Sequence, residues 1–254
     1  MDAPTPRTAL VTGAGRRIGR VVALGLAKDG FAVAVHFNRS EKKARAVVET
    51  IVDGGGRAAL VRADLGHEEQ VKGLIGEANG RLGALGLLVN NASVFEDDRA
   101  DTATRESWDM HMEINLRAPF VLTQAFAAQL PGGASGSVIN LLDQRVWNLT
   151  PYFLTYTLSK SGLWTLTRTL ALSLAPDIRV NAIGPGPVLP SARQSAEAFA
   201  AQAGATPLGR NVEAEEILGA VRFILAAPSM TGQMIALDGG QHLGWAANRE
   251  PPQE

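Results

Sequence analysis

The chain has 254 residues, 46% of them hydrophobic, and a formal net charge of −1 at pH 7. This size and apolar content fit one large α/β domain, and the near-neutral charge gives no electrostatic reason to expect nucleic acid or an anionic membrane as a partner. Cysteine is absent, which excludes disulfides and thiolate chemistry.

Apolar runs alternate with longer amphipathic stretches along the whole chain. The runs predict strands at residues 8–12, 31–36, 58–62, 87–90, 137–141, 179–182 and 234–237. The stretches between them predict helices at residues 18–29, 41–52, 68–81, 105–129 and 214–226, and one more that carries Tyr156 and continues to about residue 174. Near-continuous apolar strands separated by helices indicate a parallel sheet covered on both faces. We therefore predict one doubly wound, Rossmann-type α/β domain over residues 1–254.

One long stretch and one end depart from this alternation. Residues 184–206 are rich in proline and glycine and show no helical or strand period. Because a long irregular stretch inside a compact domain is often functional, we expect a substrate loop at about residues 184–207. The end of the chain, about residues 248–254, is expected to be frayed.

Metal and membrane sites are not indicated. No two of the four histidines stand at metal-ligand spacing, so no metal is expected. No apolar run approaches membrane-spanning length, and the first residues show no apolar targeting region. We expect a cytoplasmic protein without a membrane partner.

A glycine-rich turn follows the first predicted strand and opens the first predicted helix. Gly13, Gly15 and Gly19 would let the backbone approach a pyrophosphate, whose charge the helix N-terminus favours. The alternative is a tight strand-to-helix turn without a ligand. In this context the pattern favours a dinucleotide site.

The end of the second predicted strand bears on which dinucleotide binds. A site for NAD usually has an acidic residue there, but Asn38, Arg39 and Ser40 precede the first acid, Glu41. Arginine and serine side chains are suitable partners for an extra phosphate, and Arg17 adds a second arginine. These residues favour NADP(H). The alternative for Arg39 is a solvated surface arginine.

Polar residues also follow the third and fourth predicted strands. Asp64 could bind the adenine edge or cap the next helix. The segment from Asn90 to Ser93 lies where ligands of such sheets bind, beyond the carboxyl ends of the strands. Its alternative is an Asx-type turn without a ligand.

Tyr156 and Lys160 are four residues apart in a predicted helix, which places both side chains on one face. A nearby cation favours the phenolate, so the pattern predicts a tyrosine that releases its proton more easily than its ordinary pKa of about 10 suggests. Asp143 precedes this pair, just after the fifth predicted strand.

Together these motifs resemble the short-chain dehydrogenase/reductase family. The resemblance extends over essentially the whole chain and rests on Thr12-Gly13 with Gly19, Asn90-Asn91-Ala92, Asn115, Tyr156 with Lys160, Pro185-Gly186 and Asp238-Gly239-Gly240. It implies a seven-stranded sheet, a nicotinamide cofactor and a homotetramer.

Two departures make the chain similar to one branch of that family, the pteridine and dihydromonapterin reductases. Arg17 stands where the usual loop has glycine, and Asp143 stands where the usual catalytic residue is serine. The same branch resembles this chain at residues 36–40, 91–95 and 237–243.

The resemblance implies a role for each matching residue. Tyr156 would supply a proton, Lys160 would bind the nicotinamide ribose and tune Tyr156, Asp143 would partner Tyr156, and Asn115 would support the lysine through a water-linked path. Ser93 would touch cofactor and substrate, Phe95 would stack on a pterin ring, and Arg17 would bridge cofactor phosphate and pterin. The other residues expected at the cofactor are Gly13, Gly15, Ile18, Gly19, His36, Asn38, Arg39, Ser40, Asp64, Leu65, Asn91, Ala92, Pro185, Gly186 and Val188.

Some of these roles have structural alternatives. Asp143 could be a loop acid or helix cap, and Phe95 an ordinary core aromatic. Trp147 could shape the substrate pocket or pack at a subunit interface.

The leading hypothesis is an NADPH-dependent reductase of a C=N bond in a pterin or dihydrofolate-like ring. A carboxyl group suits a protonated ring nitrogen or an N–H donor better than a ketone oxygen, so Asp143 favours imine reduction. The alternatives are an NADPH-dependent carbonyl reductase of ketones or 3-oxoacyl substrates, and a non-catalytic NADP-binding sensor. A sensor would need neither Tyr156 nor Lys160.

Overall fold

Seven parallel strands form one central sheet in the computed structural model, which describes residues 5–191 and 193–244. The strand order is β3-β2-β1-β4-β5-β6-β7, and every neighbouring pair is parallel. The strands are β1 (Thr8–Val11), β2 (Ala32–Phe37), β3 (Ala58–Arg62), β4 (Leu87–Asn90), β5 (Gly136–Leu141), β6 (Ile178–Pro185) and β7 (Met234–Leu237).

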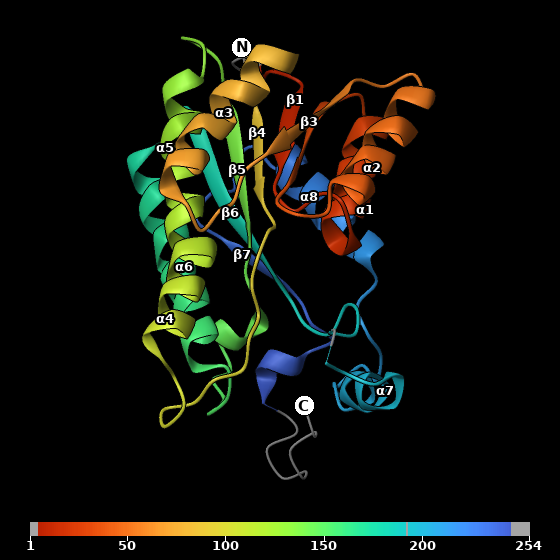
Figure 1. Cartoon of the computed structure of the whole chain (residues 1–254), viewed down its shortest axis with the longest axis vertical. Helices are drawn as coiled ribbons and strands as arrows, with labels where there is room; N and C mark the ends of the chain where they lie inside the picture. Colours follow the sequence, from red (N-terminus) through yellow and green to blue (C-terminus); the bar gives the residue numbers. More distant parts are fainter. Residues whose placement is uncertain (1–4, 192, 245–254) are drawn as a thin grey trace.

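Helices cover both faces of this sheet (Figure 1). The helices α1 (Arg17–Lys28), α2 (Glu41–Asp53) and α8 (Ala214–Ala226) pack on one face, and α3 (Glu68–Leu82), α5 (Ala118–Gln129) and α6 (Leu154–Ser173) on the other. Shorter elements complete the fold: α4 (Arg105–Met112), the π-helical turn η1 (Glu113–Arg117), the 3₁₀ turns η2 (Gln144–Val146) and η3 (Gln241–Leu243), and α7 (Ala196–Gly204).

Successive side chains of a strand point to opposite faces of the sheet, and they build the two larger of three hydrophobic clusters in the described residues. In β4, Leu87 and Val89 join the core under α1, α2 and α8, whereas Leu88 joins the core under α3, α5 and α6. All three side chains are fully buried, which explains why the strands read as continuous apolar runs. The predicted single doubly wound domain and its seven-stranded sheet are confirmed.

Three predictions of local structure need correction. Residues 196–204, expected to be irregular, form α7; the segment is rich in alanine, and the Ser195 hydroxyl accepts a hydrogen bond from the Ala198 amide at 3.1 Å. Gly184 and Pro185 belong to β6, so the irregular loop begins only after the strand. The helix expected over 105–129 is interrupted by η1. The end expected to be frayed lies outside the described residues.

The topology places the functional candidates at one edge of the sheet. Strand order reverses between β1 and β4, and ligands of such folds bind beyond the carboxyl ends of the strands near this point. The glycine-rich turn follows β1, Asn91 follows β4, Asp143 follows β5, and Gly186 follows β6. Residues far apart in the chain therefore meet in one region.

Candidate active site

The glycine-rich turn has no room for side chains at two of its positions. Gly13 has a φ of +65°, and a Cβ there would lie 3.2 Å from the Ala92 Cα. A Cβ on Gly19 would lie 2.5 Å from the Gly13 carbonyl oxygen and 2.6 Å from the Asn91 amide nitrogen. The Asn91 side chain in turn donates a hydrogen bond to the Thr12 carbonyl at 2.7 Å. Asn91 and Ala92 therefore support the glycine-rich turn directly from the end of β4.

His36 holds the same turn from β2. The Gly13 amide donates to His36 Nδ1 at 3.0 Å, so the proton of the neutral ring is on Nε2, which donates to the Ala63 carbonyl at 3.1 Å. Burial lowers the pKa of His36 to about 4 because it disfavours the charged ring. Both ring nitrogens are thus engaged within the protein, and the structure places His36 behind the turn as a support.

Arg17 begins α1 with an unusual backbone. Its φ of +53° lies in the left-handed region that glycine adopts readily, and the resemblance has glycine at this position. The guanidinium donates to the carbonyls of Pro190 at 2.7 Å and Leu189 at 3.0 Å. Burial, together with the neighbouring charge of Arg16, lowers the pKa of Arg17. Arg17 therefore connects the glycine-rich turn to the segment that follows β6.

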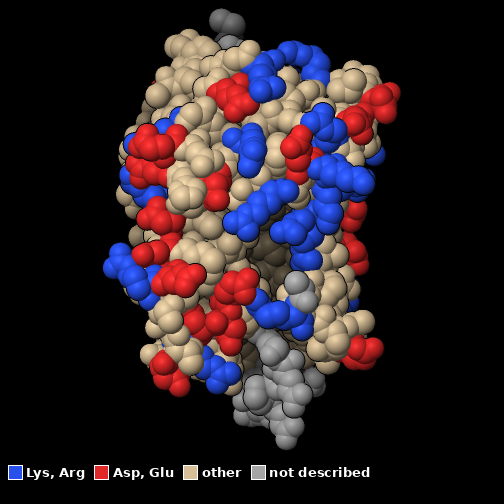
Figure 2. Space-filling view, viewed as in Figure 1, with Lys and Arg blue, Asp and Glu red and all other residues tan. Residues whose placement is uncertain are grey.

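The residues expected to select the dinucleotide lie just beyond β2. Arg39 is exposed, and Asn38 and Ser40 are half-buried. In Figure 2, lysine and arginine side chains gather beside a hollow in the face shown. This arrangement leaves the Arg39 guanidinium accessible to a phosphate group.

Asp64 closes a turn after β3. Its carboxylate accepts a hydrogen bond from the Gly66 amide at 3.0 Å. Burial opposes ionisation, but hydrogen bonds from Gly66 and from the Asn38 side chain outweigh it and lower the pKa of Asp64. The residue before α3 is His67, so Asp64 is not the N-cap of that helix and its expected capping role is corrected to an Asx-type turn. Its contact with adenine stays a prediction.

Asp143 and Tyr156 are directly hydrogen-bonded. The Tyr156 hydroxyl donates to Asp143 Oδ2 at 2.9 Å, and Asp143 Oδ1 accepts from the Arg145 amide at 2.8 Å. The second bond fixes the carboxylate at the end of β5, and α6 positions the phenol. Asp143 is also the N-cap of η2, as its helix-cap alternative proposed, but the same carboxylate contacts the tyrosine that the helical spacing singled out.

Lys160 is buried behind this pair. Its ammonium group donates to the Leu141 carbonyl at 2.8 Å and lies 5.8 Å from the centre of the Tyr156 ring. Burial, opposed by the charge of Asp143, lowers the pKa of Lys160 to about 8. The lysine and the tyrosine therefore share one face of α6, as the spacing predicted.

The prediction that the pKa of Tyr156 lies below its ordinary value is wrong. Burial raises the pKa of Tyr156 well above its ordinary value, and the charge of Asp143 and the hydrogen bond to it act in the same direction. The prediction considered only the lysine. In the folded chain, desolvation and the facing carboxylate outweigh the opposing charge of Arg145, so the phenol stays protonated at neutral pH.

Asn115 is fully satisfied inside the protein. It lies in η1, where its side-chain oxygen accepts from the Val94 amide at 2.9 Å and the Ser93 hydroxyl at 3.1 Å. Its amide group donates to the Val94 carbonyl at 3.0 Å and the Ser159 hydroxyl at 3.1 Å. Asn115 thus ties the segment after β4 to α6. Its expected water-linked path to Lys160 stays a prediction.

Phe95 lies beside Tyr156 and contacts a second phenylalanine, and its expected stacking on a pterin ring stays a prediction. Its ring stacks on Phe153, with centroids 4.2 Å apart and an interplanar angle of 6°. The Tyr156 ring meets Phe95 edge-on at 4.7 Å. Arg193 donates to the Phe95 carbonyl at 2.7 Å and also pairs with Glu96. Phe153 and Arg193 were missed by sequence reasoning, because neither stands in a recognisable motif.

Trp147 contacts a different set of side chains. Its ring meets Trp164 at 6.4 Å and His242 at 5.2 Å, both edge-on, and 44% of the residue is exposed. Its place in the substrate pocket stays a prediction.

The remaining expected cofactor residues differ in burial. Leu65 and Val188 each contribute their side chains to a hydrophobic core. Ile18 packs against the core that contains Val188. Gly186 closely approaches the end of β7: its amide donates to the Leu237 carbonyl at 2.9 Å, and a Cβ on Gly186 would lie 2.7 Å from the Asp238 Cα. These residues can reach a ligand chiefly through their backbone.

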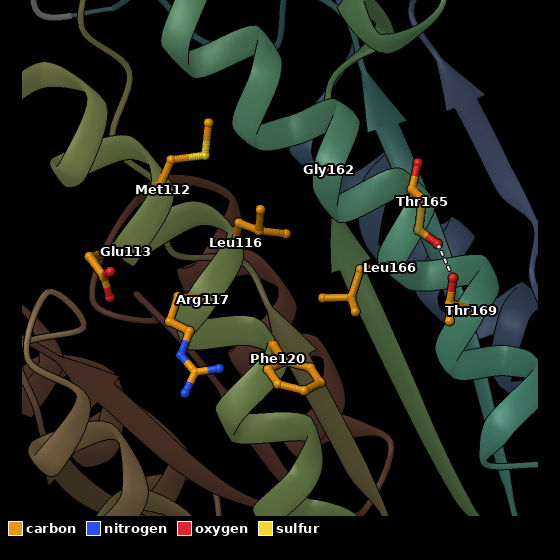
Figure 3. A pocket seen from close by; sticks show the side chains of 9 residues that line it. All are labelled: Met112, Glu113, Leu116, Arg117, Phe120, Gly162, Thr165, Leu166 and Thr169. Atoms are coloured by element: carbon orange, nitrogen blue, oxygen red, sulfur yellow. Dashed lines mark hydrogen bonds between the residues drawn. The ribbon is translucent and has the colours of Figure 1, made fainter.

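A groove of about 450 Å³ lies elsewhere on the molecule (Figure 3). None of the predicted site residues lines it. Its lining comes from α4, η1, α5 and α6 and consists of Met112, Glu113, Leu116, Arg117, Phe120, Gly162, Thr165, Leu166 and Thr169. The groove is therefore separate from the candidate active site.

The described residues show neither a metal site nor a membrane-spanning helix. Within residues 5–191 and 193–244, no cluster of three or more histidine, cysteine, aspartate or glutamate residues could hold a metal ion. No helix in this part of the chain combines the length and apolar character needed to cross a membrane.

Comparison with known proteins agrees with this geometry. A family model described as enoyl-(acyl carrier protein) reductase matches residues 13–242. The chain belongs to the short-chain dehydrogenase/reductase family. It is an oxidoreductase, and the resemblance drawn from its sequence motifs is confirmed.

Individual relatives match over nearly their whole length. An uncharacterized oxidoreductase of Methylorubrum extorquens is 36% identical, with 92% of this chain and 97% of the relative covered. A 3-oxoacyl-[acyl-carrier-protein] reductase of Synechocystis is 33% identical, with 94% and 98% covered. The crystal structure of FolM alternative dihydrofolate reductase 1 from Brucella canis, complexed with NADP, is 47% identical, with a TM-score of 0.93 and coverage of 99% and 98%. Its counterpart from Brucella suis, also with NADP, is 49% identical, with a TM-score of 0.92 and 99% of each chain covered.

Proposed function

We propose that this protein is an NADPH-dependent reductase of a C=N bond in a pterin or dihydrofolate-like ring. The observation that supports this best is the hydrogen bond between Tyr156 and Asp143 beside the ring of Phe95. The two solved structures of alternative dihydrofolate reductases, which share nearly half of their residues with this chain, support the same class of substrate.

The residues around the glycine-rich turn fit a dinucleotide. A side chain at Gly19 would collide with the Gly13 carbonyl, and Gly13 has a positive φ that favours glycine, so the turn before α1 keeps its backbone free of side chains at both positions. Arg39 and Ser40 suit the 2′-phosphate that distinguishes NADP from NAD. Lys160 would hold the nicotinamide ribose. When bound in this site, NADPH supplies the hydride.

The chain itself supplies and controls the proton. The Tyr156 phenol stays protonated at neutral pH because it is buried and faces Asp143. Asp143, held by the Arg145 amide, orients the hydroxyl and offers a negative charge to a protonated ring nitrogen of the substrate. Positioned proton transfer of this kind typically contributes roughly 10²–10⁴-fold to the rate. This division of labour favours reduction of an imine.

The aromatic side chains suit a flat substrate. Phe95 would stack on the pterin ring with its face opposite Phe153. Arg17, Ser93, Trp147 and the segment after β6 would complete the pocket. The cation of Arg17, now bonded to the Leu189 and Pro190 carbonyls, stands between the glycine-rich turn and this segment.

A carbonyl reductase of ketones or 3-oxoacyl groups is the second candidate. Relatives named 3-oxoacyl-[acyl-carrier-protein] reductase favour it, at 33% to 34% identity. Asp143 disfavours it, because a carboxylate repels the negative charge that develops on a carbonyl oxygen. A sensor without catalysis has no use for the hydrogen-bonded pair of buried Tyr156 and half-buried Asp143.

A substrate panel separates these functions. Purified protein is assayed with NADPH and, in turn, a dihydropterin, dihydrofolate and an activated ketone, while NADPH binding is measured directly. We expect turnover with the pterin ring. Turnover of the ketone alone would establish the carbonyl reductase, and binding of NADPH without turnover of any substrate would establish the sensor.

We also propose that the protein is a cytoplasmic homotetramer. The apolar groove between α5 and α6 (Figure 3) supports the assembly, because Leu116, Phe120 and Leu166 are only partly buried there in the single chain. Equivalent faces of two copies could cover one another around a two-fold axis.

A further inference from the structure

Two acidic residues of a distant loop accept hydrogen bonds from the backbone at the start of α6, the helix that carries Tyr156. The Phe153 amide donates to the Asp97 carboxylate at 3.2 Å, the Leu154 amide to the Asp98 carbonyl at 3.0 Å, and the Thr155 amide to the Asp98 carboxylate at 2.9 Å. The first amides of a helix have no partner within it, and here a segment more than fifty residues away supplies the partners. The loop after β4 therefore caps α6.

The residue just before this helix, its N-cap, has a strained backbone. Phe153 has a φ of +55°, which is a rare conformation for a bulky aromatic residue and costs on the order of 1–3 kcal/mol. Its amide is fixed by Asp97, and its ring is stacked on Phe95. Such strain persists only where the surroundings enforce it, and it is concentrated at functional sites. Both of these contacts come from residues 95–98, and the guanidinium groups of Arg145 and Arg193 also lie near the Phe153 ring.

Asp98 accepts several hydrogen bonds at the start of α6. It is 4% exposed, and its carboxylate accepts from the Thr155 amide, from the Thr155 hydroxyl and from the Ser107 hydroxyl at 2.8 Å. His111 Nδ1 lies 2.7 Å from the same Thr155 hydroxyl. Burial opposes ionisation, but the hydrogen bonds from Thr155 and Ser107 outweigh it and keep the pKa of Asp98 below its ordinary value. A negative charge at this place also suits the N-terminus of a helix.

We propose that Asp98 is the positioning residue of Tyr156. It fixes the first turn of α6 at Thr155, the residue immediately before the tyrosine, and so determines where the phenol hydroxyl meets Asp143. Since proton transfer depends steeply on geometry, a displacement of about 1 Å can lower the rate by roughly 10²-fold. The role rests on the proposed function only in its choice of dihydropterin as the assay substrate.

The direct test is Asp98→Asn, which keeps the shape but replaces one acceptor oxygen with an amide that faces the donors around Thr155. We expect kcat with a dihydropterin to fall at least tenfold, while the Kd for NADPH stays within twofold of the wild-type value. Hydrogen exchange at the amides of residues 153–156 should become faster. The matched control is Asp97→Asn, because the exposed Asp97 offers a single acceptor that asparagine retains. Its kcat should stay within threefold of wild type.

A second pair of variants probes the same contact from α6. Thr155→Val removes the hydroxyl that donates to Asp98 and should lower kcat, whereas Thr155→Ser retains the hydroxyl and should keep kcat within threefold of wild type. If Asp98→Asn fails to fold, the two Thr155 variants still test the contact.

Two results would overturn the proposal. One is an unchanged kcat in both Asp98→Asn and Thr155→Val. The other is a loss of kcat that accompanies an equal loss of NADPH affinity, which would indicate general damage to the fold. If the wild-type protein does not reduce the dihydropterin, the proposed function fails. The role of Asp98 is then decided by hydrogen exchange at residues 153–156 and by kcat with the ketone that the wild-type protein does reduce.

Discussion

The Tyr156 hydroxyl donates a hydrogen bond of 2.9 Å to the Asp143 carboxylate, in a setting where burial alone already disfavours the phenolate. The proton of this hydrogen bond lies between two acidic groups, which is where the proposed reduction of a ring C=N bond requires it. Serine at position 143 could not place a charge there. This relationship makes the chain distinguishable by experiment from carbonyl reductases of the same fold.

Replacing the carboxylate tests this distinction. In Asp143→Ser we expect kcat for a dihydropterin to fall by about 10²-fold or more, with little change in NADPH affinity, because the lost interaction forms mainly in the transition state. Weak turnover of an activated ketone should appear. Steady-state kinetics on both substrates measure the effect, and a variant that retains full pterin turnover would contradict it.

Removing the phenol hydroxyl tests the proton donor. Tyr156→Phe keeps the shape of the side chain and its edge contact with Phe95, so NADPH affinity should change little. Turnover should fall by about 10²-fold or more because the hydroxyl proposed to deliver the proton is lost. Single-turnover kinetics check this result. A nearly normal rate would move proton donation to Asp143.

We expect cofactor choice to depend on Arg39, the exposed arginine after β2. Arg39→Ala should weaken NADPH binding by about 1.5–3 kcal/mol, because a charge-assisted hydrogen bond to the 2′-phosphate is lost. NADH binding should change much less. Titration of both dinucleotides into wild type and variant provides the comparison; equal losses, or a wild-type preference for NADH, would refute this interpretation of the strand end.

Stability should depend on pH through His36. Its folded-state pKa of about 4 lies below the unfolded value of 6.5, so the unfolded chain binds more protons between these values. The contribution of His36 is fully present above pH 6.5 and is lost as pH falls towards 4. Between pH 7 and 5 this group alone should lower the free energy of unfolding by about 2 kcal/mol.

Urea denaturation at a series of pH values measures this dependence. In His36→Asn, which lacks the titrating ring, the free energy of unfolding should be lower at pH 7 and should change less between pH 7 and 5. If the free energy of unfolding changes equally with pH in the two proteins, the pKa of His36 is not lowered in the folded chain.

Assembly can be tested on the exposed side of α6. Thr165 is exposed and lines the apolar groove, so Thr165→Arg places a charge in the proposed contact without disturbing a core. We expect the molar mass from light scattering to decrease. Val52→Arg, an equally large change at a residue that is 51% exposed on α2, should leave the mass unchanged. A tetramer in both variants would place the interface elsewhere.

The overall architecture was predictable because each strand is a short run of apolar residues that can be recognised in the sequence. Leu87, Leu88 and Val89 are buried towards different layers, and this two-sided burial is what a continuous apolar run means in a parallel sheet. The π-helical turn at 113–117 was not predictable, because its backbone follows from tertiary contacts of Asn115 and not from a local pattern. Helix α7 could have been found from its alanine content and the preceding serine.

The site was predictable where chemistry and spacing coincide. Tyr156, Lys160 and Asp143 meet as the motifs indicated. The pKa of Tyr156 was predicted in the wrong direction, because burial is a property of the fold and has no counterpart in the spacing of two residues. The contact of Asp98 with Thr155 joins residues 57 positions apart, and nothing local marks it.

Arg17 shows how this chain trades local stability for placement of a charge. A glycine at that position would relax the left-handed backbone, and proteins are commonly stabilised by such changes. It would also remove the cation that reaches from the first turn of α1 to the Leu189 and Pro190 carbonyls. A screen that selects only for thermal stability would therefore favour a variant that has lost the hydrogen bonds between position 17 and the segment after β6. Position 17 should be held fixed in any attempt to make this enzyme more robust.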